Sequence, residues 1–315
     1  MMKKEQFEID LVYLWVDGND PQWQAKKAAL TNQPYDNSEA NSKARYINND
    51  ELKYALRSAE KYVPWIRQIF IVTDNQKPDW LNTDNPKIKV IDHKEIIPAE
   101  ALPCFNSSVI EYFIHKIPGL SEHFLFANDD MFFNDFLQPD FFFTEEGLPI
   151  VRLKRKFFGK WHNRLELLFK DLGQYAKMLM DSSILVEQKF GKHYSSVPHH
   201  NIDAYRKSDY KNAVEDVFNE QVKKSQVNHI RTYGDLHRSA FTYYSLAINH
   251  AVLKHVTRSE SSRILVSRHD FQKYLDQNKP KLFCLNDDQR VKDERREKIK
   301  PFLEHLFPLK SAFEK

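Results

Sequence analysis

The sequence predicts an α/β fold with a mostly parallel sheet, and two features of the chain indicate it. Short apolar runs typical of buried strands alternate with segments whose apolar residues recur at helical spacing. Strands separated by helices usually form a parallel sheet, whose strands all end at one edge. Acidic residues follow the ends of several runs. They are expected at the edge where open α/β sheets bind ligands.

The composition indicates a globular protein with a large core. Of the 315 residues 41% are hydrophobic, and 23 are Phe, so a disordered chain is excluded. The 47 basic and 44 acidic residues nearly balance, giving a net charge of +3. This balance argues against nucleic acid as the main partner.

Several other classes of protein are disfavoured. None of the seven glycines lies in a P-loop or dinucleotide-binding pattern. The two cysteines, Cys104 and Cys284, predict neither a disulfide framework nor a zinc site. No apolar run is long enough for a secretory leader or a membrane span, so the sequence predicts a cytoplasmic protein.

The first half of the chain contains the clearest strands and helix. A strand is predicted at 11–16, a helix at 49–62, and further strands at 68–74 and 87–93. Residues 22–48 are polar and too long for an ordinary connection. They could form a substrate-covering loop or a mobile surface excursion.

The central feature is an apolar run at 123–133 that is interrupted by Asp129 and Asp130. Neighbouring carboxylates repel each other, so a divalent cation between them and an anionic substrate would explain the pair. A solvated Asn-Asp-Asp turn is the alternative. The same rim is expected to hold other residues that follow strand ends, namely Asp17, Asp74, Asp92 and His93.

A helix is predicted to start just before this strand. Ser108 and Glu111 fit a capping box that opens a helix through Ile117. A helix N-terminus beside an acidic rim could seat a phosphate or sugar hydroxyls. Capping would explain Ser108 and Glu111, but it does not require Asn106 and Ser107.

The second half is predicted to be mainly helical. A strand at 148–153 precedes the basic and aromatic cluster at 154–161, which could contact a diphosphate or an anionic membrane, or could be a solvated loop. A strand at 281–285 leads into Asn286-Asp287-Asp288, the tripeptide seen at 128–130. Helices are predicted at 165–185, 208–222, 234–255 and 291–306.

Two basic motifs in this half could carry chemistry. His199 and His200 could be metal ligands, acid/base groups or structural residues. Arg231 could clamp a phosphate with its planar donor fork, and a surface ion pair would explain it equally well.

The chain resembles the Stealth phosphotransferases, which include bacterial capsular-polysaccharide sugar-1-phosphate transferases and the lysosomal-enzyme N-acetylglucosamine-1-phosphotransferase. The stretch Tyr-Leu-Trp-Val-Asp-Gly-Asn-Asp-Pro at 13–21 resembles the first conserved region of that family. Residues 49–133 resemble the second region, 198–231 the third, and 284–314 the fourth. Residues 154–196 match no motif of the family.

The resemblance implies a Rossmann-like nucleotide-sugar fold related to GT-A glycosyltransferases, with a helical insertion in the C-terminal half. It implies an enzyme that uses Mg²⁺ or Mn²⁺ and a UDP-sugar, and that transfers sugar-1-phosphate to a glycan hydroxyl. The products would be a phosphodiester and UMP, in capsular or cell-surface polysaccharide synthesis. The alternatives are a metal-dependent GT-A glycosyltransferase that releases UDP and a non-catalytic glycan- or membrane-binding module.

The resemblance also implies roles for particular residues. The expected metal ligands are Asp129, Asp130 and Asp287. The expected catalytic residues are Arg231, Asp130 and one of His199 and His200. The residues expected to bind the nucleotide and sugar are Trp15, Asp17, Asn106, Ser107 and Glu111.

We expect one catalytic unit over 1–315. Its parts are a nucleotide-sugar core at 1–153, a mainly helical insertion with the His/Arg region at 154–260, and a segment at 261–315 that returns to the core. The expected partners are a UDP-sugar and a glycan acceptor that is lipid-linked, with peripheral contact at the inner face of the plasma membrane and no nucleic acid.

Overall fold

The computed structural model describes residues 7–31, 42–156, 173–232 and 234–315. Its strands are β1 (Ile9–Leu14), β2 (Ile69–Thr73), β3 (Ile88–Asp92), β4 (His123–Asn128), β5 (Met131–Phe133), β6 (Ile150–Lys154), β7 (Val197–Pro198), β8 (Asp203–Arg206), β9 (Val252–His255), β10 (Ser261–Leu265) and β11 (Leu282–Asn286). Its helices are α1 (Pro21–Thr31), α2 (Glu51–Tyr62), α3 (His93–Ile96), α4 (Ser107–Tyr112), α6 (Gln174–Phe190), α7 (Lys207–Asn212), α8 (Asn219–Gln226), α9 (Ser239–Ala247), α10 (Phe271–Asn278), α11 (Asp293–Arg296) and α12 (Ile299–Leu306).

A five-stranded sheet with the order β3-β2-β1-β4-β8 forms the centre of the molecule. Its first four strands are parallel, and β8 joins β4 in the antiparallel direction. All six residues of β1 are buried, as expected for a strand covered on both faces. The predicted α/β fold with a mostly parallel sheet is therefore confirmed.

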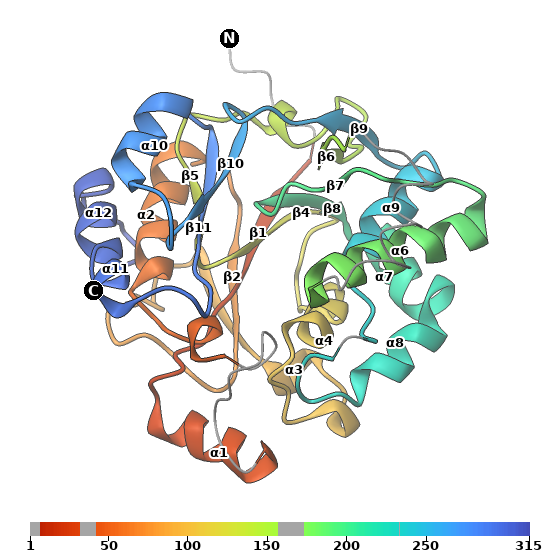
Figure 1. The fold of residues 1–315 in the computed structure, drawn as a ribbon, viewed down its shortest axis with the longest axis horizontal. Coiled ribbons are helices and arrows are strands. Elements are labelled where there is room, and N and C mark those ends of the chain that lie inside the picture. The colour runs from red at the N-terminus through yellow and green to blue at the C-terminus, as the bar shows by residue number, and fades with distance from the viewer. Residues whose placement is uncertain (1–6, 32–41, 157–172, 233) are drawn as a thin grey trace.

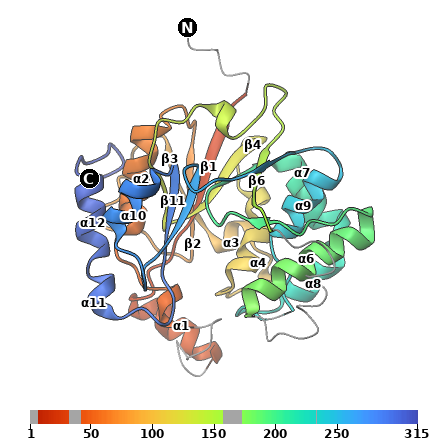
Figure 2. The same cartoon turned by 45° about the horizontal axis from the view of Figure 1, so that its top comes forward.

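Helices cover both faces of this sheet (Figure 1). One face packs against α2, with α10, α11 and α12 on the same side, and the other packs against α4, α7 and α9. The turned view in Figure 2 keeps the same two groups apart, with the strands between them. None of the helices in the described ranges is both long and apolar enough to cross a bilayer.

Two small sheets extend the centre. One has the order β7-β6-β9, and the other has the order β10-β11-β5. In the second, β5 and β11 are antiparallel, and Met131 lies opposite Cys284. This pairing brings residues 282–286 against the strand that follows Asp129 and Asp130.

Residues near position 314 are fixed to α2 by a buried ion pair. Arg57 of α2 donates from Nε and Nη2 to the two carboxylate oxygens of Glu314, over 2.8 and 2.9 Å. Its Nη1 donates to the carbonyl oxygen of Phe307 over 2.7 Å. The guanidinium therefore joins α2 to the segment that follows α12.

Several predicted elements differ from the observed ones. The polar region 22–48 begins within α1, which the sequence did not reveal because only Trp23 and Lys27 of that helix are buried. The helix predicted at 234–255 is instead α9 followed by the exposed strand β9. The helix predicted at 208–222 is divided into α7, a π-helical turn at Ala213–Val217, and α8. The first part of the helix predicted at 165–185 lies outside the described residues.

Candidate active site

The acidic pair lies where β4 ends, on the edge that the parallel strands share. Burial, with a smaller contribution from the charge of Asp287, raises the pKa of Asp130 to about 6. The Sγ of Cys284 donates to Asp130 Oδ2 over 3.2 Å. Asp130 Oδ1 is buried and has no hydrogen-bond partner in the part of the chain that the structure describes. An unpaired buried carboxylate oxygen is costly, so a cation would stabilise it.

A third carboxylate, Glu51, belongs to the same group. Glu51 is the first residue of α2, and burial raises its pKa to about 7, with a further contribution from Asp130. The pKa of Asp129 is raised well above its ordinary value, first by burial and then by Glu51 and Asp130. The sequence analysis placed Glu51 only within the helix predicted at 49–62 and gave it no role in the site. Only folding brings Glu51 close to Asp129 and Asp130, so no local sequence pattern could reveal its place in the site.

These acids fit a cation that completes its coordination with substrate and water. Within the described ranges, no three His, Cys, Asp or Glu side chains converge on a metal position. Mg²⁺ commonly takes one or two carboxylates, together with phosphates and waters, and Asp129 and Asp130 suit that arrangement. The third expected ligand, Asp287, instead accepts hydrogen bonds from Arg296 on both oxygens, over 2.7 and 3.1 Å. It would have to leave this ion pair to bind a metal.

The N-terminus of α4 brings two expected site residues together. Asn106 caps the helix by accepting from the Ser108 amide over 3.1 Å, so the predicted capping box of Ser108 and Glu111 is wrong. The helix begins earlier than predicted, and the amide oxygen of Asn106 fills that role. Nη2 of Arg231 donates to the hydroxyl of Ser107. The Nε of Arg231 is buried and unpaired within the described structure.

Asn106 is itself held in place by the loop that carries Arg231. Its Nδ2 donates to Asp235 over 2.7 Å and to the carbonyl of Asn228 over 3.0 Å. Asp235 also accepts from the amide of Thr232 over 2.7 Å. Residues 228–232 and Asp235 therefore pack together against the start of α4.

Arg238 links Glu111 to β8. Its Nε donates to Glu111 over 3.0 Å, and its Nη1 donates to Asp203 over 2.8 Å and to the hydroxyl of Tyr205 over 2.6 Å. Burial lowers the pKa of Arg238, but the neighbouring Tyr205, Glu111 and Asp203 have the larger combined effect. The pKa of Arg238 is therefore raised well above its ordinary value. The sequence analysis did not single out Arg238. A lone arginine in a helical pattern does not reveal that its partners lie on α4 and β8.

The two expected histidines have different surroundings. Both ring nitrogens of His199 are engaged, Nδ1 with Ser261 Oγ at 2.7 Å and Nε2 with Asp203 at 3.1 Å. His200 has a left-handed backbone with φ of 57°, and its ring meets that of Tyr175 edge to face at 5.8 Å. Burial, with Arg263 and Arg238, lowers the pKa of His200 to about 3. His199 is therefore a supporting residue, whereas His200 has its ring available.

Two further groups surround His200. The ring of His237 lies 5.4 Å from that of Tyr175, and its Nδ1 accepts from the Ser239 amide at 3.0 Å. The neutral imidazole consequently carries its proton on Nε2. Burial and the arginines Arg238 and Arg231 lower the pKa of His237 well below its ordinary value. Both His237 and Tyr175 were missed, because their sequence positions fit helical core packing.

The end of β1 supplies the remaining expected residues. Trp15 is buried, and its amide donates to the carbonyl of Val72 over 3.0 Å. Asp17 accepts from the Asn19 amide at 2.9 Å, and its own amide donates to Gln76. Asp17 thereby orders the turn between β1 and α1.

The neighbouring strand ends add Asp74 and His93. Asp74 pairs with Lys26 of α1 at 2.5 Å, and its Oδ1 lies 4.0 Å from His93 Nδ1. Asp74 Oδ2 and His93 Nδ1 are buried and unpaired among the described residues. The predicted clustering of strand-end acids is thus observed around β1, β2 and β3.

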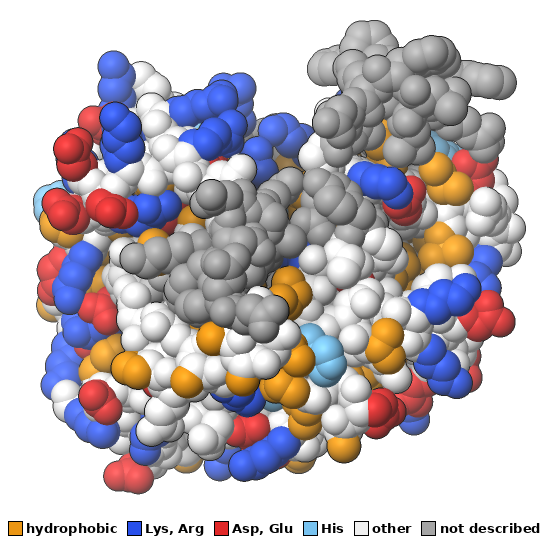
Figure 3. All heavy atoms as spheres, turned by 60° about the horizontal axis from the view of Figure 1, so that its bottom comes forward, with side chains coloured by type: hydrophobic (Ala, Val, Ile, Leu, Met, Phe, Trp, Pro, Cys, Tyr) orange, Lys and Arg blue, Asp and Glu red, His pale blue; other side chains and the backbone are white. Residues whose placement is uncertain are grey.

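The charge of Arg263 in β10 affects the pKa of His200 and also that of Cys284, the thiol beside the acidic pair. It lowers the pKa of His200, and it partly opposes the raised pKa of Cys284, which bonds Asp130. Figure 3 looks toward the carboxyl ends of the parallel strands. Among the described residues of this face, acidic and basic side chains are interspersed toward the margins of the view. The site is therefore a local pairing of carboxylates with arginines and histidines.

Fold and site together define an α/β protein whose sheet edge sets carboxylates beside arginines and histidines, a combination suited to a phosphorylated ligand. Three models of conserved regions match the chain: Stealth protein conserved region 1 at 7–34, region 2 at 45–151 and region 4 at 273–315. The chain belongs to the Stealth family.

Relatives of the chain carry names from polysaccharide synthesis. It is 34% identical to the exopolysaccharide phosphotransferase SCO2594 of Streptomyces coelicolor, over 98% of this chain and 52% of the relative. It is 33% identical to the capsular polysaccharide phosphotransferase SacB of Neisseria meningitidis serogroup A, over 98% of this chain and 57% of the relative. The chain thus spans about half the length of these relatives.

Among solved structures, the chain is similar to the galactosyltransferase LgtC, with a TM-score of 0.45, 11% identity and 95% coverage of both chains. It is also similar to the glycosyltransferase GlyE of Streptococcus pneumoniae TIGR4. That TM-score is 0.44 at 8% identity, over 96% of this chain and 61% of the other.

Proposed function

We propose that this chain is a phosphotransferase unit that moves sugar-1-phosphate from a UDP-sugar to a hydroxyl of a glycan. The product is a phosphodiester, and UMP is released. The names of the relatives support transfer in capsular or exopolysaccharide synthesis. The observation that carries the proposal is the group of Arg231, His200 and His237, which Arg263 links to the acidic pair because its charge acts on both His200 and Cys284, the thiol that donates to Asp130. It offers donors for phosphate oxygens where a metal-bound diphosphate would lie.

The bond changes follow from this assignment. The acceptor oxygen attacks the phosphorus that bears the sugar, and the bond from that phosphorus to the bridging oxygen breaks. The bridging oxygen leaves as part of UMP, and the acceptor proton passes to the ring of His200. Arg231, whose Nε is buried without a partner in the described structure, donates to the non-bridging oxygens as charge shifts toward UMP.

The surroundings of His200 suit a base that becomes active when the donor binds. Arg263 and Arg238 contribute to its low pKa in the protein alone. A diphosphate beside these arginines would offset their charge and raise the pKa of His200. Its ability to accept the acceptor proton therefore depends on the presence of the donor.

A divalent cation, Mg²⁺ or Mn²⁺, held by Asp129 and Asp130 would neutralise charge on the diphosphate. Glu51 adds negative charge to this position, and Asp287 stays with Arg296 as a weaker candidate ligand.

The expected donor-binding residues divide into two sets. Trp15 and Asp17, at the end of β1, suit the nucleotide end of the donor, and Ser107 lies with Arg231 where the phosphates would be. Asn106 and Glu111 act through other residues. Asn106 holds the Asp235 loop, and Glu111 holds Arg238.

Product analysis tests the proposal. The protein would be incubated with a panel of UDP-sugars, Mg²⁺ or Mn²⁺ and capsule-type glycan acceptors, and the released nucleotide identified. UMP together with a phosphorus resonance typical of a diester is the expected result. UDP with a plain glycosidic product would instead make the chain a glycosyltransferase, and no turnover of any donor would favour a binding module.

We further propose that the unit acts in the cytoplasm at the inner face of the plasma membrane, on a lipid-linked acceptor. Lys154 and Arg155 are exposed at the end of β6, and Lys156 follows them, which suits contact with anionic lipid. The rest of the basic cluster, at 157–161, lies outside the described residues. Binding to vesicles with phosphatidylglycerol should weaken when Lys154, Arg155 and Lys156 are changed to Gln, and unchanged binding would remove this role.

A further inference from the structure

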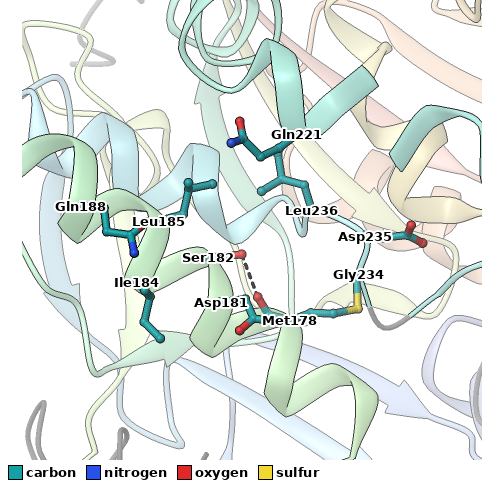
Figure 4. Close-up of a pocket in the computed structure, with 10 residues that line it drawn as sticks. All are labelled: Met178, Asp181, Ser182, Ile184, Leu185, Gln188, Gln221, Gly234, Asp235 and Leu236. Carbon is teal, nitrogen blue, oxygen red and sulfur yellow. Dashed lines mark hydrogen bonds between the residues drawn. The ribbon is translucent and has the colours of Figure 1, made fainter. Parts of the chain in front are cut away.

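A separate pocket lies between α6, α8 and the loop before α9 (Figure 4). Its volume is about 240 Å³, small enough to suit a single sugar unit rather than a whole nucleotide sugar. The lining residues are Met178, Asp181, Ser182, Ile184, Leu185, Gln188, Gln221, Gly234, Asp235 and Leu236.

The lining indicates which kind of ligand fits. Among the described residues that line it are two carboxylates, of Asp181 and Asp235, and no basic side chain, so these residues would disfavour an anion such as phosphate. Met178, Leu185 and Leu236 offer an apolar surface, and Gln188 and Gln221 offer neutral amides. An apolar surface beside neutral amides and carboxylates matches a sugar ring, which has apolar C–H faces and hydroxyls at its edge.

One lining group lacks the partner that it needs. The Oε1 of Gln221 is buried and accepts no hydrogen bond from the described residues. A buried amide oxygen without a donor costs free energy, which a hydroxyl from a ligand would recover. Asp235 and Ser182 of the same lining already have partners. Gln221 is therefore the group that a ligand would satisfy.

The pocket adjoins the candidate active site through two shared elements. Met178 lies one helical turn after Tyr175, whose ring contacts both His200 and His237. Ser182 Oγ is 3.4 Å from the carbonyl of His237. Asp235 belongs to the loop that positions Arg231. A glycan with one unit in the pocket could thus extend toward the phosphate-binding residues.

We propose that this pocket is an acceptor subsite, which holds a neutral sugar unit of the acceptor glycan away from the reacting hydroxyl. The proposal rests on the proposed function for its role in transfer. The binding that it predicts requires no turnover.

Methyl resonances of methionine provide a direct test. The chain has five Met residues, and Met178 lines the pocket. The protein is labelled with ¹³C-methyl methionine. It is titrated with neutral di- to tetrasaccharides of hexoses and N-acetylhexosamines and, for comparison, with inorganic phosphate. The spectrum of Met178→Leu assigns the Met178 signal, because that signal is missing from it. We expect at least one saccharide to shift this signal and phosphate to leave it unchanged.

Two variants locate the contact. Gln221→Leu removes the unpaired carbonyl and should weaken saccharide binding about 3- to 10-fold, the range for one hydrogen bond. Gln272→Leu, on the exposed side of α10, should leave it unchanged. The proposal is overturned if no saccharide shifts Met178, if phosphate shifts it instead, or if Gln221→Leu binds as the natural protein does. Absence of UMP release, with saccharide binding intact, would count against the proposed function alone.

Discussion

At the scale of single residues, Asp130 and Glu51 make a distinctive prediction about pH and metal. Their pKa values of about 6 and 7 exceed the ordinary 3.8 and 4.5. Between about pH 4 and 7 the folded protein therefore binds more protons than the unfolded chain, and their contribution to stability falls as pH rises through that window. A bound cation would recover it. We expect Mn²⁺ to raise Tm more at pH 8 than at pH 5.

Asp130→Asn supplies the control for this experiment. The variant keeps the shape of the side chain, so it should fold, yet the Tm increase from Mn²⁺ at pH 8 should largely disappear. Turnover should fall on the order of 10² to 10³, the usual cost of losing a group that stabilises transition-state charge. A Tm increase as large as in the natural protein would remove Asp130 from the metal site.

Arg231 makes a second prediction at this scale. Its role at the phosphates is exerted mainly as charge shifts to the leaving group, so Arg231→Ala should lower kcat about 10²- to 10³-fold with a smaller rise in KM. Arg258→Ala, an exposed arginine before β10, is the matched control and should change neither constant. A rise in KM at unchanged kcat would reassign Arg231 to ground-state binding.

Asp129 and Asp130 were predicted because two adjacent acids follow a buried strand, whereas the roles of Ser107 and Arg231 came from the resemblance to the Stealth family. The sequence did not predict Glu51 or His237. Their importance comes from burial and from charges on distant segments, and no local pattern records those. The choice between His199 and His200 likewise needed the partners of each ring. These site roles remain predictions.

At the scale of elements, the ion pair between α2 and the segment after α12 makes a stability prediction. Arg57 and Glu314 have side chains only 7% and 3% exposed, so Arg57→Met leaves a buried carboxylate without its main partner. The cost should be about 3 to 5 kcal/mol in the free energy of unfolding. Urea titration of the variant and the natural protein would measure it.

The comparison variant is Arg290→Met. Arg290 pairs with Asp288, but its side chain is 64% exposed, and such pairs contribute about 1 kcal/mol or less. Equal losses in the two variants would mean that the link between α2 and residue 314 adds no more than a surface pair.

Elements with buried apolar residues were predicted well from the sequence, and exposed elements were predicted poorly. Strands β1, β2 and β4 were found because both of their faces are apolar, and β3 was found although Lys89 is exposed, because Ile88, Val90 and Ile91 form a short β-branched run. Strand β9 was missed because its four residues are all exposed and their pattern continues that of α9. The chain changes direction there to pair β9 with β6, a long-range contact that periodicity does not reveal.

At the scale of the whole molecule, the acidic pair and Arg231 should behave as one unit, since both act on the same diphosphate. The double variant Asp130→Asn, Arg231→Ala should then lose little more activity than the worse single variant, because groups that work together are not additive. Initial rates at saturating donor would give the comparison. A loss equal to the product of the single losses would show that the two groups act independently.

The pairing of β5 with β11 has a consequence for protein synthesis. A ribosome releases the amino-terminal part of a chain first. The carboxylates at 129 and 130 therefore emerge well before Cys284, which lies 154 residues after its partner Asp130. Until residues 282–286 have left the exit tunnel, a nascent chain lacks the strand that covers β5 and the thiol that bonds Asp130. A frameshift just before residue 282 would thus remove Asp287 but spare Arg231 and His200, and it would still leave the acidic pair incompletely formed.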